Sequence, residues 1–468
     1  MAPREVKKYG SMSPPNSKTS AFSASQGTSF GSTVANLSKI CVGTGVLALP
    51  YSFAQGGVLC SVFGLAVIAV WNSYSISRLL KCEEIIVSMG FQRRGDVGTF
   101  SAIAKEAVGN VGLSLVDYTI VIMMVGVCIS YQVAAAGFLA NDPTLSFGTA
   151  ANTVLTAVVL LPISCVPDIG FLSKYSVMGL GAIVISFLVI FYHGYTEYGL
   201  SGFGDVPVST LYPDSLTNLS HWYGVSCFCF GISPMTFNVK DSMSEPSTMN
   251  SACRVALLVV FLSYCVIGDG TLLLLTPDGA PGITGDILQS LPAASLMASF
   301  VRISMTFVCL VSFPLCMVPA AEVVEGKLFM TGKNSEPTPV HLRVMTRSVL
   351  VAVSTTVAAL IPSFVLIVSL IGCLCVGLVT FIFPPFFHMM LLKHQREYNR
   401  DSKERHSLLD VESHNGEFTD EGAGVIQEEE EERMKKIRLD RVMLVLGVIS
   451  TIFTTGMTLG SVAESMRT

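Results

Sequence analysis

The chain has 468 residues, of which 51% are hydrophobic and 13% are charged, and its net charge is -5. Its mean hydropathy is +0.59. Soluble globular proteins carry about 25% charged residues, so the composition excludes an ordinary soluble domain and indicates a membrane protein with several spans.

Residues 1–28 are polar and rich in serine, a composition typical of a disordered tail. They lack the charged start and short apolar core of a secretory signal peptide. We therefore expect a cytoplasmic tail here, and we expect the first membrane span to act as its own insertion signal.

Apolar runs that are long enough, or nearly long enough, to cross a bilayer recur from residue 29 to residue 463. A membrane helix needs about 20 mostly apolar residues. This region is the predicted transmembrane domain, and a short external tail follows it at 464–468. Eleven runs qualify, at 31–55, 57–79, 113–140, 149–166, 173–197, 218–238, 253–275, 293–319, 344–361, 363–392 and 440–463.

The first run makes a poor lipid-facing helix. Glycine loosens a helix, and proline removes a backbone donor. Unwound backbone at membrane depth persists only where protein buries it or water wets it. We therefore interpret this run as a broken helix that forms the wall of a binding site. The interrupting residues are Asn36, Lys39, Gly43, Thr44, Gly45 and Pro50.

The sixth run is interrupted in the same way, by Gly231, Ser233 and Pro234. Two interrupted spans that lie five apart predict a 5+5 inverted-repeat bundle, here with one extra helix. In such a bundle the amino ends of half-helices offer N–H groups to a carboxylate, and the carboxyl ends offer carbonyls to a cation. The alternative is that these glycines only let helices pack closely.

Basic residues orient the predicted spans. With the amino end in the cytoplasm, Arg467 is the one basic residue, among 29, that falls in an outer segment. Lys39 and Arg302 lie within spans, and the others fall in inner segments or at the inner ends of spans. Membrane proteins concentrate basic residues on the cytoplasmic side. The count therefore predicts a multi-pass protein with a cytoplasmic amino end.

Two inner segments are long enough to have a role of their own. Residues 80–112 contain an amphipathic stretch, which we expect to lie along the inner face of the membrane. Residues 393–439 include five consecutive glutamates, Glu428 to Glu432. Such a run is typical of a solvated, disordered loop and is less often a docking site for a partner.

The segment NLSKICVGTGVLALPY, from Asn36 to Tyr51, resembles the opening signature of the amino acid/auxin permease family, within the amino acid–polyamine–organocation superfamily. SFPLCMVPA (312–320) and SLIGCLCVGLVTFIFPPFFHM (369–389) are also similar to segments of that family. The resemblance covers essentially the whole membrane region. It implies eleven spans in an all-α bundle and secondary transport of amino acids, driven by a proton or sodium gradient.

The resemblance also implies roles for particular residues. Gly43, Thr44 and Gly45 would expose N–H groups to the substrate carboxylate, and Ser233, with the backbone near Gly231, would face the substrate from the sixth span. In sodium-coupled relatives, an asparagine at the position of Asn36 and a hydroxyl in the eighth span help to hold the ion. The hydroxyl candidates are Thr306 and Ser312. Proton-coupled members share the motif, so the coupling ion stays open.

Ionisable groups inside a bilayer usually have a partner or a function, because each costs roughly 2.5–3.5 kcal/mol to insert. Lys39 lies near the inner end of its span, where its amine can reach the interface. Arg302 lies deeper, or else nearer the outer interface than the span limits place it. Asp269 is a candidate proton relay or a partner of Arg302; alternatively it is an outer-interface residue.

The sequence shows no nucleotide-binding loop, metal-ligand spacing or catalytic triad, so we expect neither an enzyme nor a cofactor. The 13 cysteines lie in or beside apolar spans, where cysteine behaves as a small buried apolar residue. The scarcity of charge at the predicted membrane midplane favours neutral amino acids as substrates. No partner beyond substrate and lipid is indicated, and in particular no nucleic acid.

Three functions compete at this point. The first is alternating-access transport at the plasma membrane or at a vacuolar or lysosomal membrane. The second is an amino acid sensor that keeps the pocket and signals through its cytoplasmic tails. The third is an ion channel, which is disfavoured because no span presents regularly spaced pore charges.

Overall fold

The computed structural model of the chain describes residues 27–90, 99–166, 170–203, 206–275, 283, 285–292, 295–329, 339–410 and 420–467. Most of the predicted amino-terminal tail lies outside this range. The described residues are helical or irregular, apart from one isolated bridge between Thr28 and Met243. The predicted all-α, polytopic architecture is confirmed.

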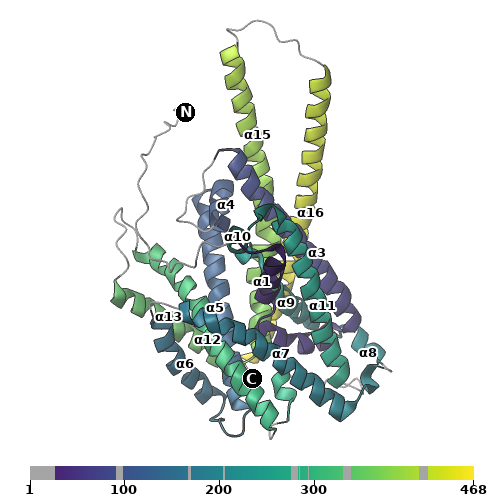
Figure 1. Ribbon diagram of the computed structural model, residues 1–468, viewed down its shortest axis with the longest axis vertical. Helices are drawn as coiled ribbons and strands as arrows, with labels where there is room; N and C mark the ends of the chain where they lie inside the picture. Colours follow the sequence, from purple (N-terminus) through teal and green to yellow (C-terminus); the bar gives the residue numbers. More distant parts are fainter. Residues whose placement is uncertain are drawn as a thin grey trace.

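Within the described residues, eight helices are long and apolar enough to cross a membrane. They follow the predicted spans in chain order, and the tenth span runs through a π-helical segment, η6. Figure 1 shows them gathered into one bundle. Their bounds are α3 (Val58–Ser88), α5 (Asn110–Ala140), α7 (Gly170–Tyr198), α11 (Met249–Leu275), α12 (Leu296–Phe329), α13 (Val340–Leu360), α14 (Phe364–Ile371) with η6 (Gly372–Ile382) and α15 (Phe383–Asp410), and α16 (Asp420–Ser465).

Three further predicted spans are shorter or interrupted. The first is split into two helices that meet at 52°, and the sixth is split as well. The parts are α1 (Phe30–Cys41), η1 (Thr44–Ala48) and α2 (Leu49–Gly56) for the first span, α6 (Thr149–Cys165) for the fourth, and α9 (Leu216–Cys229), η3 (Ser233–Met235) and α10 (Thr236–Asp241) for the sixth. The connecting pieces are α4 (Thr99–Val108), η2 (Ser201–Phe203), α8 (Val208–Leu211), η4 (Pro246–Thr248) and η5 (Ile287–Ser290).

The break in the first span follows from its residues. Helix α1 ends at Cys41, and Gly43 is extended, with φ -107° and ψ -166°. A short 3₁₀ turn, η1, then leads into α2, and Pro50 lies in the first turn of α2. Proline is tolerated there because the first N–H groups of a helix have no partner within the helix. Pro50 therefore starts the second half-helix, while the residues around Gly43 make the break.

The sixth span breaks after Cys229, and Pro234 again lies in the first turn of the segment that follows. Upstream of this break, Gly224 has a different role. A Cβ atom on Gly224 would collide with the Ser369 carbonyl of α14, and one on Gly372 would collide with the Gly224 carbonyl. These two glycines allow close helix packing, so the packing interpretation holds here although both lie near the break.

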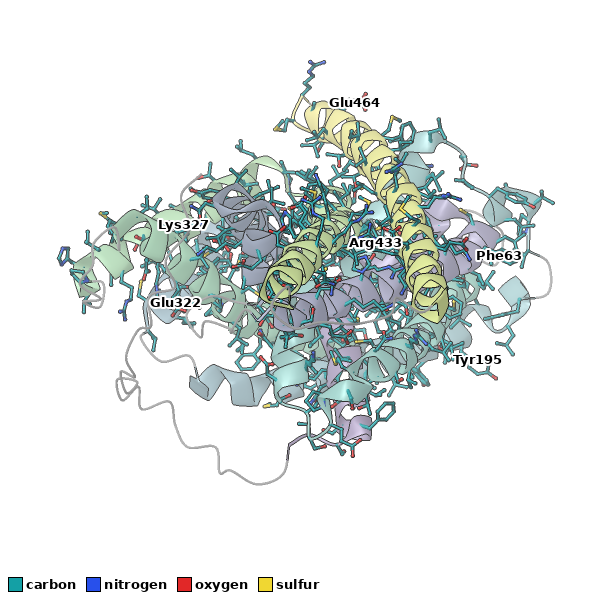
Figure 2. The ribbon with its side chains drawn as sticks, turned by 90° about the horizontal axis from the view of Figure 1, so that it is seen from above. Phe63, Tyr195, Glu322, Lys327, Arg433 and Glu464 are labelled. Carbon is teal, nitrogen blue, oxygen red and sulfur yellow. The ribbon has the colours of Figure 1, made fainter. Side chains whose placement is uncertain are left out.

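Large apolar side chains cover the outside of the bundle. Phe63 and Tyr195, which point away from the helices in Figure 2, are 69% and 59% exposed. An apolar surface of this extent is exceptional for a soluble monomer, whereas hydrocarbon solvates it well. This surface agrees with the integral, multi-pass membrane protein that the sequence predicts.

Much of the predicted loop at 393–439 is helical, which corrects the expectation of disorder for its described residues. Helices α15 and α16 continue side by side beyond the rest of the bundle (Figure 1). Glu431 and Glu432 form ion pairs with Lys435 and Lys436, one helical turn away, with N–O distances of 3.9 and 3.1 Å. Such pairs stabilise a helix. We predicted that the glutamate run belongs to a disordered loop. In the structure its last two residues, Glu431 and Glu432, instead stabilise α16.

A buried ionic cluster fastens α16 to the bundle. Asp440 of α16 is fully buried, and its carboxylate lies 2.9 Å from the Arg78 Nε of α3 and 2.6 Å from the His388 Nδ1 of α15. The Tyr74 hydroxyl also donates to this carboxylate. A buried carboxylate is stable only when it is paired and hydrogen-bonded, and here one ion pair and two hydrogen bonds from two other helices meet that need.

Candidate functional site

Two adjoining cavities lie beside the broken helices. The larger has a volume of about 520 Å³ and runs between α1, α5, α7, α10 and α12. Near α1 its wall includes Asn36, Lys39, Gly43 and Thr44, and across from them it includes Ser312. The larger cavity therefore combines amide, amine and hydroxyl groups in an otherwise apolar wall.

The smaller cavity has a volume of about 160 Å³ and lies at the breaks themselves. The first break contributes Gly43, Thr44 and Gly45, and the second contributes Gly231 and Pro234. Both breaks therefore line one space, which the sequence predicted from their spacing. The two cavities share the lining residues Ile40, Gly43, Thr44, Tyr131, Met235 and Cys316.

No charged side chain is among the residues that line the smaller cavity. The Thr44 and Tyr131 hydroxyls, thiols and backbone groups supply its polarity. The remaining wall is apolar and comes mainly from α5, α9 and η6; its members include Met123, Met124, Val127, Phe228 and Val376. Such a wall suits a ligand whose charges meet backbone dipoles and whose remaining part is apolar.

The backbone hydrogen bonds of the first break indicate which of its N–H groups can bind an anion. The Gly43 N–H already donates to the Cys41 carbonyl at 2.9 Å. Thr44 and Gly45 begin η1, and the first N–H groups of a helical turn have no partner inside it. Thr44 and Gly45 are therefore better placed than Gly43 to bind an anion.

Gly43 and Gly45 differ in the space around them. A Cβ atom on Gly43 would have no neighbour within 4 Å, whereas one on Gly45 would lie 2.6 Å from the ring of Phe228. Gly45 therefore lets the first break pack against α9, and Gly43 keeps the cavity open. Gly43 therefore fits the prediction that the break forms the wall of a binding site. Gly45 fits, in part, the alternative that glycines let helices pack closely.

The two candidate hydroxyls of the eighth span face different surroundings. Ser312 lines the larger cavity together with Asn36. The Thr306 hydroxyl donates to the Arg302 carbonyl of its own helix at 2.9 Å. A hydroxyl bonded back to its own helix is a common arrangement that satisfies it locally. Ser312 is therefore the better-placed partner for Asn36.

Two other predicted residues lie apart from the cavities. Ser233 is fully buried, and neither cavity includes it in its wall. Asp269 of α11 is also buried and lines neither cavity, and its carboxylate oxygens have no hydrogen-bond partner among the described residues. The structure thus places Gly43, Thr44, Gly45 and Gly231 around the smaller cavity and Asn36 and Ser312 around the larger one, whereas Ser233, Thr306 and Asp269 line neither.

Arg302 bonds to backbone carbonyls of the segment around η5. Its Nη2 donates to the Leu291 carbonyl at 2.7 Å and to the Leu288 carbonyl at 3.3 Å. The pairing with Asp269, which was one of the alternatives left open by the sequence, is not formed. Nearby Asp286 caps η5 by accepting the Leu288 N–H, and burial raises the pKa of Asp286 to about 7, although that N–H and the Arg302 charge lower it.

Sequence reasoning missed the residues that support the breaks from neighbouring helices. Tyr264 of α11 donates its hydroxyl at 2.8 Å to the carbonyls of Cys41 and Cys229, the last residues of α1 and α9. Asn72 of α3 donates to the Phe230 carbonyl at 2.8 Å. One signal was available: each is a polar residue within an apolar span, and such residues need a partner.

A family model described as transmembrane amino acid transporter protein matches residues 26–408. The chain belongs to this family. This match confirms the family resemblance that the sequence predicted.

Curated relatives agree with the family assignment. The chain is 24% identical over 402 residues to amino acid transporter AVT3B of Arabidopsis thaliana, covering 79% of this chain and 86% of that protein. It is also 24% identical over 373 residues to solute carrier family 38 member 10 of Rattus norvegicus, covering 76% of this chain and 32% of that protein. Among solved structures, MhsT in complex with L-phenylalanine aligns over 90% of this chain and 98% of its own, with a TM-score of 0.42 and 12% identity.

Proposed function

We propose that this member of the family is a secondary active transporter of neutral amino acids that works by alternating access, with its amino end in the cytoplasm. The observation that carries the proposal is the smaller cavity, because both broken helices line it and no charged side chain does. A zwitterion suits such a site, since half-helix ends supply partial charges of both signs.

The substrate carboxylate is assigned to the start of η1, where the Thr44 and Gly45 N–H groups lie. The ammonium group is assigned to carbonyl groups at the carboxyl end of α9, near Gly231. The substrate side chain then lies against the apolar wall formed by residues such as Met124 and Val376. An uncharged wall of this kind disfavours acidic and basic side chains, because burying an unpaired charge is expensive.

Coupling to an ion is assigned to Asn36 and Ser312, whose side-chain oxygens line the larger cavity. Oxygen ligands suit a hard cation such as sodium. The proton alternative rests on Asp269, whose buried carboxylate has no hydrogen-bond partner among the described residues. A Ser312→Ala variant should lose sodium dependence if sodium is the coupling ion, whereas Asp269→Asn should lose pH dependence if a proton is.

The test is uptake by the purified chain in liposomes. A panel of neutral, acidic and basic radiolabelled amino acids is offered under an imposed sodium gradient, an imposed proton gradient, or neither. We expect concentrative uptake of neutral amino acids under one of the two gradients. Absence of flux for the whole panel under both gradients would refute the proposal.

A second candidate is an amino acid sensor, which the paired extension of α15 and α16 beyond the bundle favours (Figure 1). These helices provide a surface through which a conformational change can reach a partner. The same liposome preparation separates the two functions. A sensor would bind a neutral amino acid with saturation, yet it would show no flux under either gradient.

A further inference from the structure

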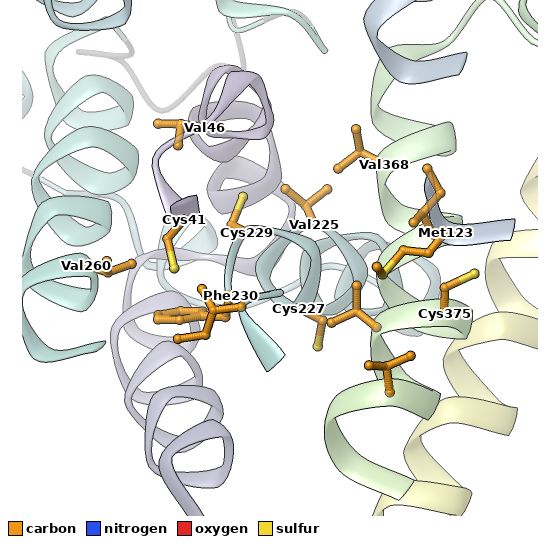
Figure 3. Packing of buried hydrophobic residues seen from close by; sticks show 14 of the residues in the cluster. Cys41, Val46, Met123, Val225, Cys227, Cys229, Phe230, Val260, Val368 and Cys375 are labelled. Carbon is orange, nitrogen blue, oxygen red and sulfur yellow. The ribbon is translucent and has the colours of Figure 1, made fainter. Parts of the chain in front are cut away.

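The two broken helices end at one place. The carbonyls of Cys41 and Cys229, at the carboxyl ends of α1 and α9, both accept from the Tyr264 hydroxyl at 2.8 Å. Cys41, Cys229 and Phe230 lie near one another in Figure 3. Helix carboxyl ends carry partial negative charge, so these two ends repel each other unless a donor lies between them.

Tyr264 is held firmly in this position. It is fully buried, and its ring packs edge-on against Phe230 with a centroid distance of 5.2 Å and an interplanar angle of 70°. Tyr264 lines neither cavity. It therefore contacts the breaks from behind and does not touch the space assigned to the substrate.

One hydrogen serves two acceptors here, because a tyrosine hydroxyl carries a single proton. The two carbonyls differ in the donors that remain to them when the Tyr264 hydroxyl points away. The Cys41 carbonyl also accepts the Gly43 N–H at 2.9 Å, while the Tyr264 hydroxyl is the donor that the described residues provide to the Cys229 carbonyl. Helix α1 can therefore release the hydroxyl at lower cost than α9 can.

We propose that Tyr264 is a positioning residue for transport, whose hydroxyl ties the carboxyl ends of α1 and α9 together and stays with α9 when α1 moves away. This inference rests on the proposed transport function. The tie holds the two breaks in one arrangement, and it opens on the α1 side when α1 moves away. A neutral hydrogen bond suits this role, since its modest net strength lets it form and break in each cycle.

The test is Tyr264→Phe in the full chain, reconstituted in liposomes. The variant keeps the ring but leaves the Cys229 carbonyl without its donor. We expect the turnover of the best wild-type substrate to fall by about tenfold, which corresponds to the loss of one buried hydrogen bond. The substrate KM should stay within about twofold of wild type, because Tyr264 does not line the cavities.

Tyr223→Phe is the matched control. Its hydroxyl donates to the Ser450 Oγ at 3.2 Å, between α9 and α16, and it does not reach the two break carbonyls. This variant loses the same atom and should keep its turnover within about twofold. Equal turnover in Tyr264→Phe and wild type would overturn the inference, as would equal losses in both variants.

A second readout reports on conformation directly. Cys316 lines both cavities, so its reaction rate with a small water-soluble thiol reagent, measured by peptide mass spectrometry, depends on which state is populated. We expect Tyr264→Phe to change this rate by at least about threefold, and Tyr223→Phe to leave it unchanged. An unchanged rate in Tyr264→Phe would overturn the inference.

Two further measurements distinguish a folding defect from a transport defect. Phe230→Leu retains the hydroxyl but removes the packed ring, and its turnover should lie between those of wild type and Tyr264→Phe. If Tyr264→Phe melts far below wild type and no longer binds substrate, Tyr264 is a general stabiliser and the inference fails. Failure of the proposed function is distinct, because the wild-type chain itself would then show no flux.

Discussion

Helices α3, α15 and α16 meet at a charged cluster, whereas α1, α9 and α11 meet at a neutral one. Asp440 forms a short ion pair with Arg78 and a short hydrogen bond with His388 in a fully buried setting. Tyr264 offers one hydrogen to two carbonyls next to a cavity. The charged cluster is hard to open, because separated buried charges are expensive, and the neutral one opens easily. We infer that the first region stays fixed while the second moves.

The largest effect is expected from Asp440→Asn. The substitution leaves the buried Arg78 without a counter-charge, so we expect the free energy of unfolding to fall by about 3–5 kcal/mol. The melting temperature of the purified protein in detergent reports the loss. Glu430→Gln is the control, because the Glu430–Arg396 pair is mostly solvent-exposed and exposed pairs contribute about 0–1 kcal/mol. Similar melting temperatures for the two variants would contradict the comparison.

A smaller effect is expected where the two breaks touch. In Gly45→Ala the new methyl group would meet the Phe228 ring at 2.6 Å, so we expect overpacking to lower stability by about 1–3 kcal/mol. Gly43→Ala makes the same chemical change in open space and should melt like the wild type. If Gly43→Ala proved the less stable of the two, the assignment of Gly45 to packing and Gly43 to the cavity would be wrong.

A third effect depends on pH and lies at the segment that Arg302 holds. The pKa of Asp286 is raised to about 7, above its unfolded value of about 3.9. The folded chain therefore binds more protons between these values, and the contribution of Asp286 to stability is full below about pH 4 and declines as the pH rises towards 7.

Asp286→Asn keeps an oxygen that can accept the Leu288 N–H but cannot ionise. The melting temperature of this variant, relative to wild type, should therefore rise between about pH 4 and pH 7 and level off above pH 7. A constant difference in melting temperature between the variant and wild type from about pH 4 to pH 7 would show that the pKa of Asp286 is the same in the folded and the unfolded chain, and would contradict this prediction.

Sequence reasoning worked where the signal lay within one segment. Gly43, Pro50, Gly231 and Pro234 interrupt long apolar runs, and the structure breaks both helices beside them. The family signature between Asn36 and Tyr51 is likewise local. The order of the spans followed from their length and hydropathy, which the chain carries without reference to its neighbours.

The sequence did not predict which side chains face a cavity or a partner, because that depends on how each helix is rotated against its neighbours. Thr306 and Ser312 are both hydroxyls in one apolar span, but only Ser312 is turned to the larger cavity. Tyr264 shows the same limit, because its two acceptors lie far away along the chain. A carboxylate partner was one alternative for Arg302, yet carbonyls of the segment around η5 accept the hydrogen bonds of its Nη2.

The central claim is that the space between the two breaks binds an amino acid, and Gly43→Leu tests it most directly. Because Gly43 has no neighbour within 4 Å of an added Cβ, the leucine side chain should fill the cavity without unfolding the chain. We predict gradient-driven amino acid uptake in wild-type liposomes and none in Gly43→Leu liposomes, with matching melting temperatures. Uptake by Gly43→Leu at the wild-type rate would contradict the account.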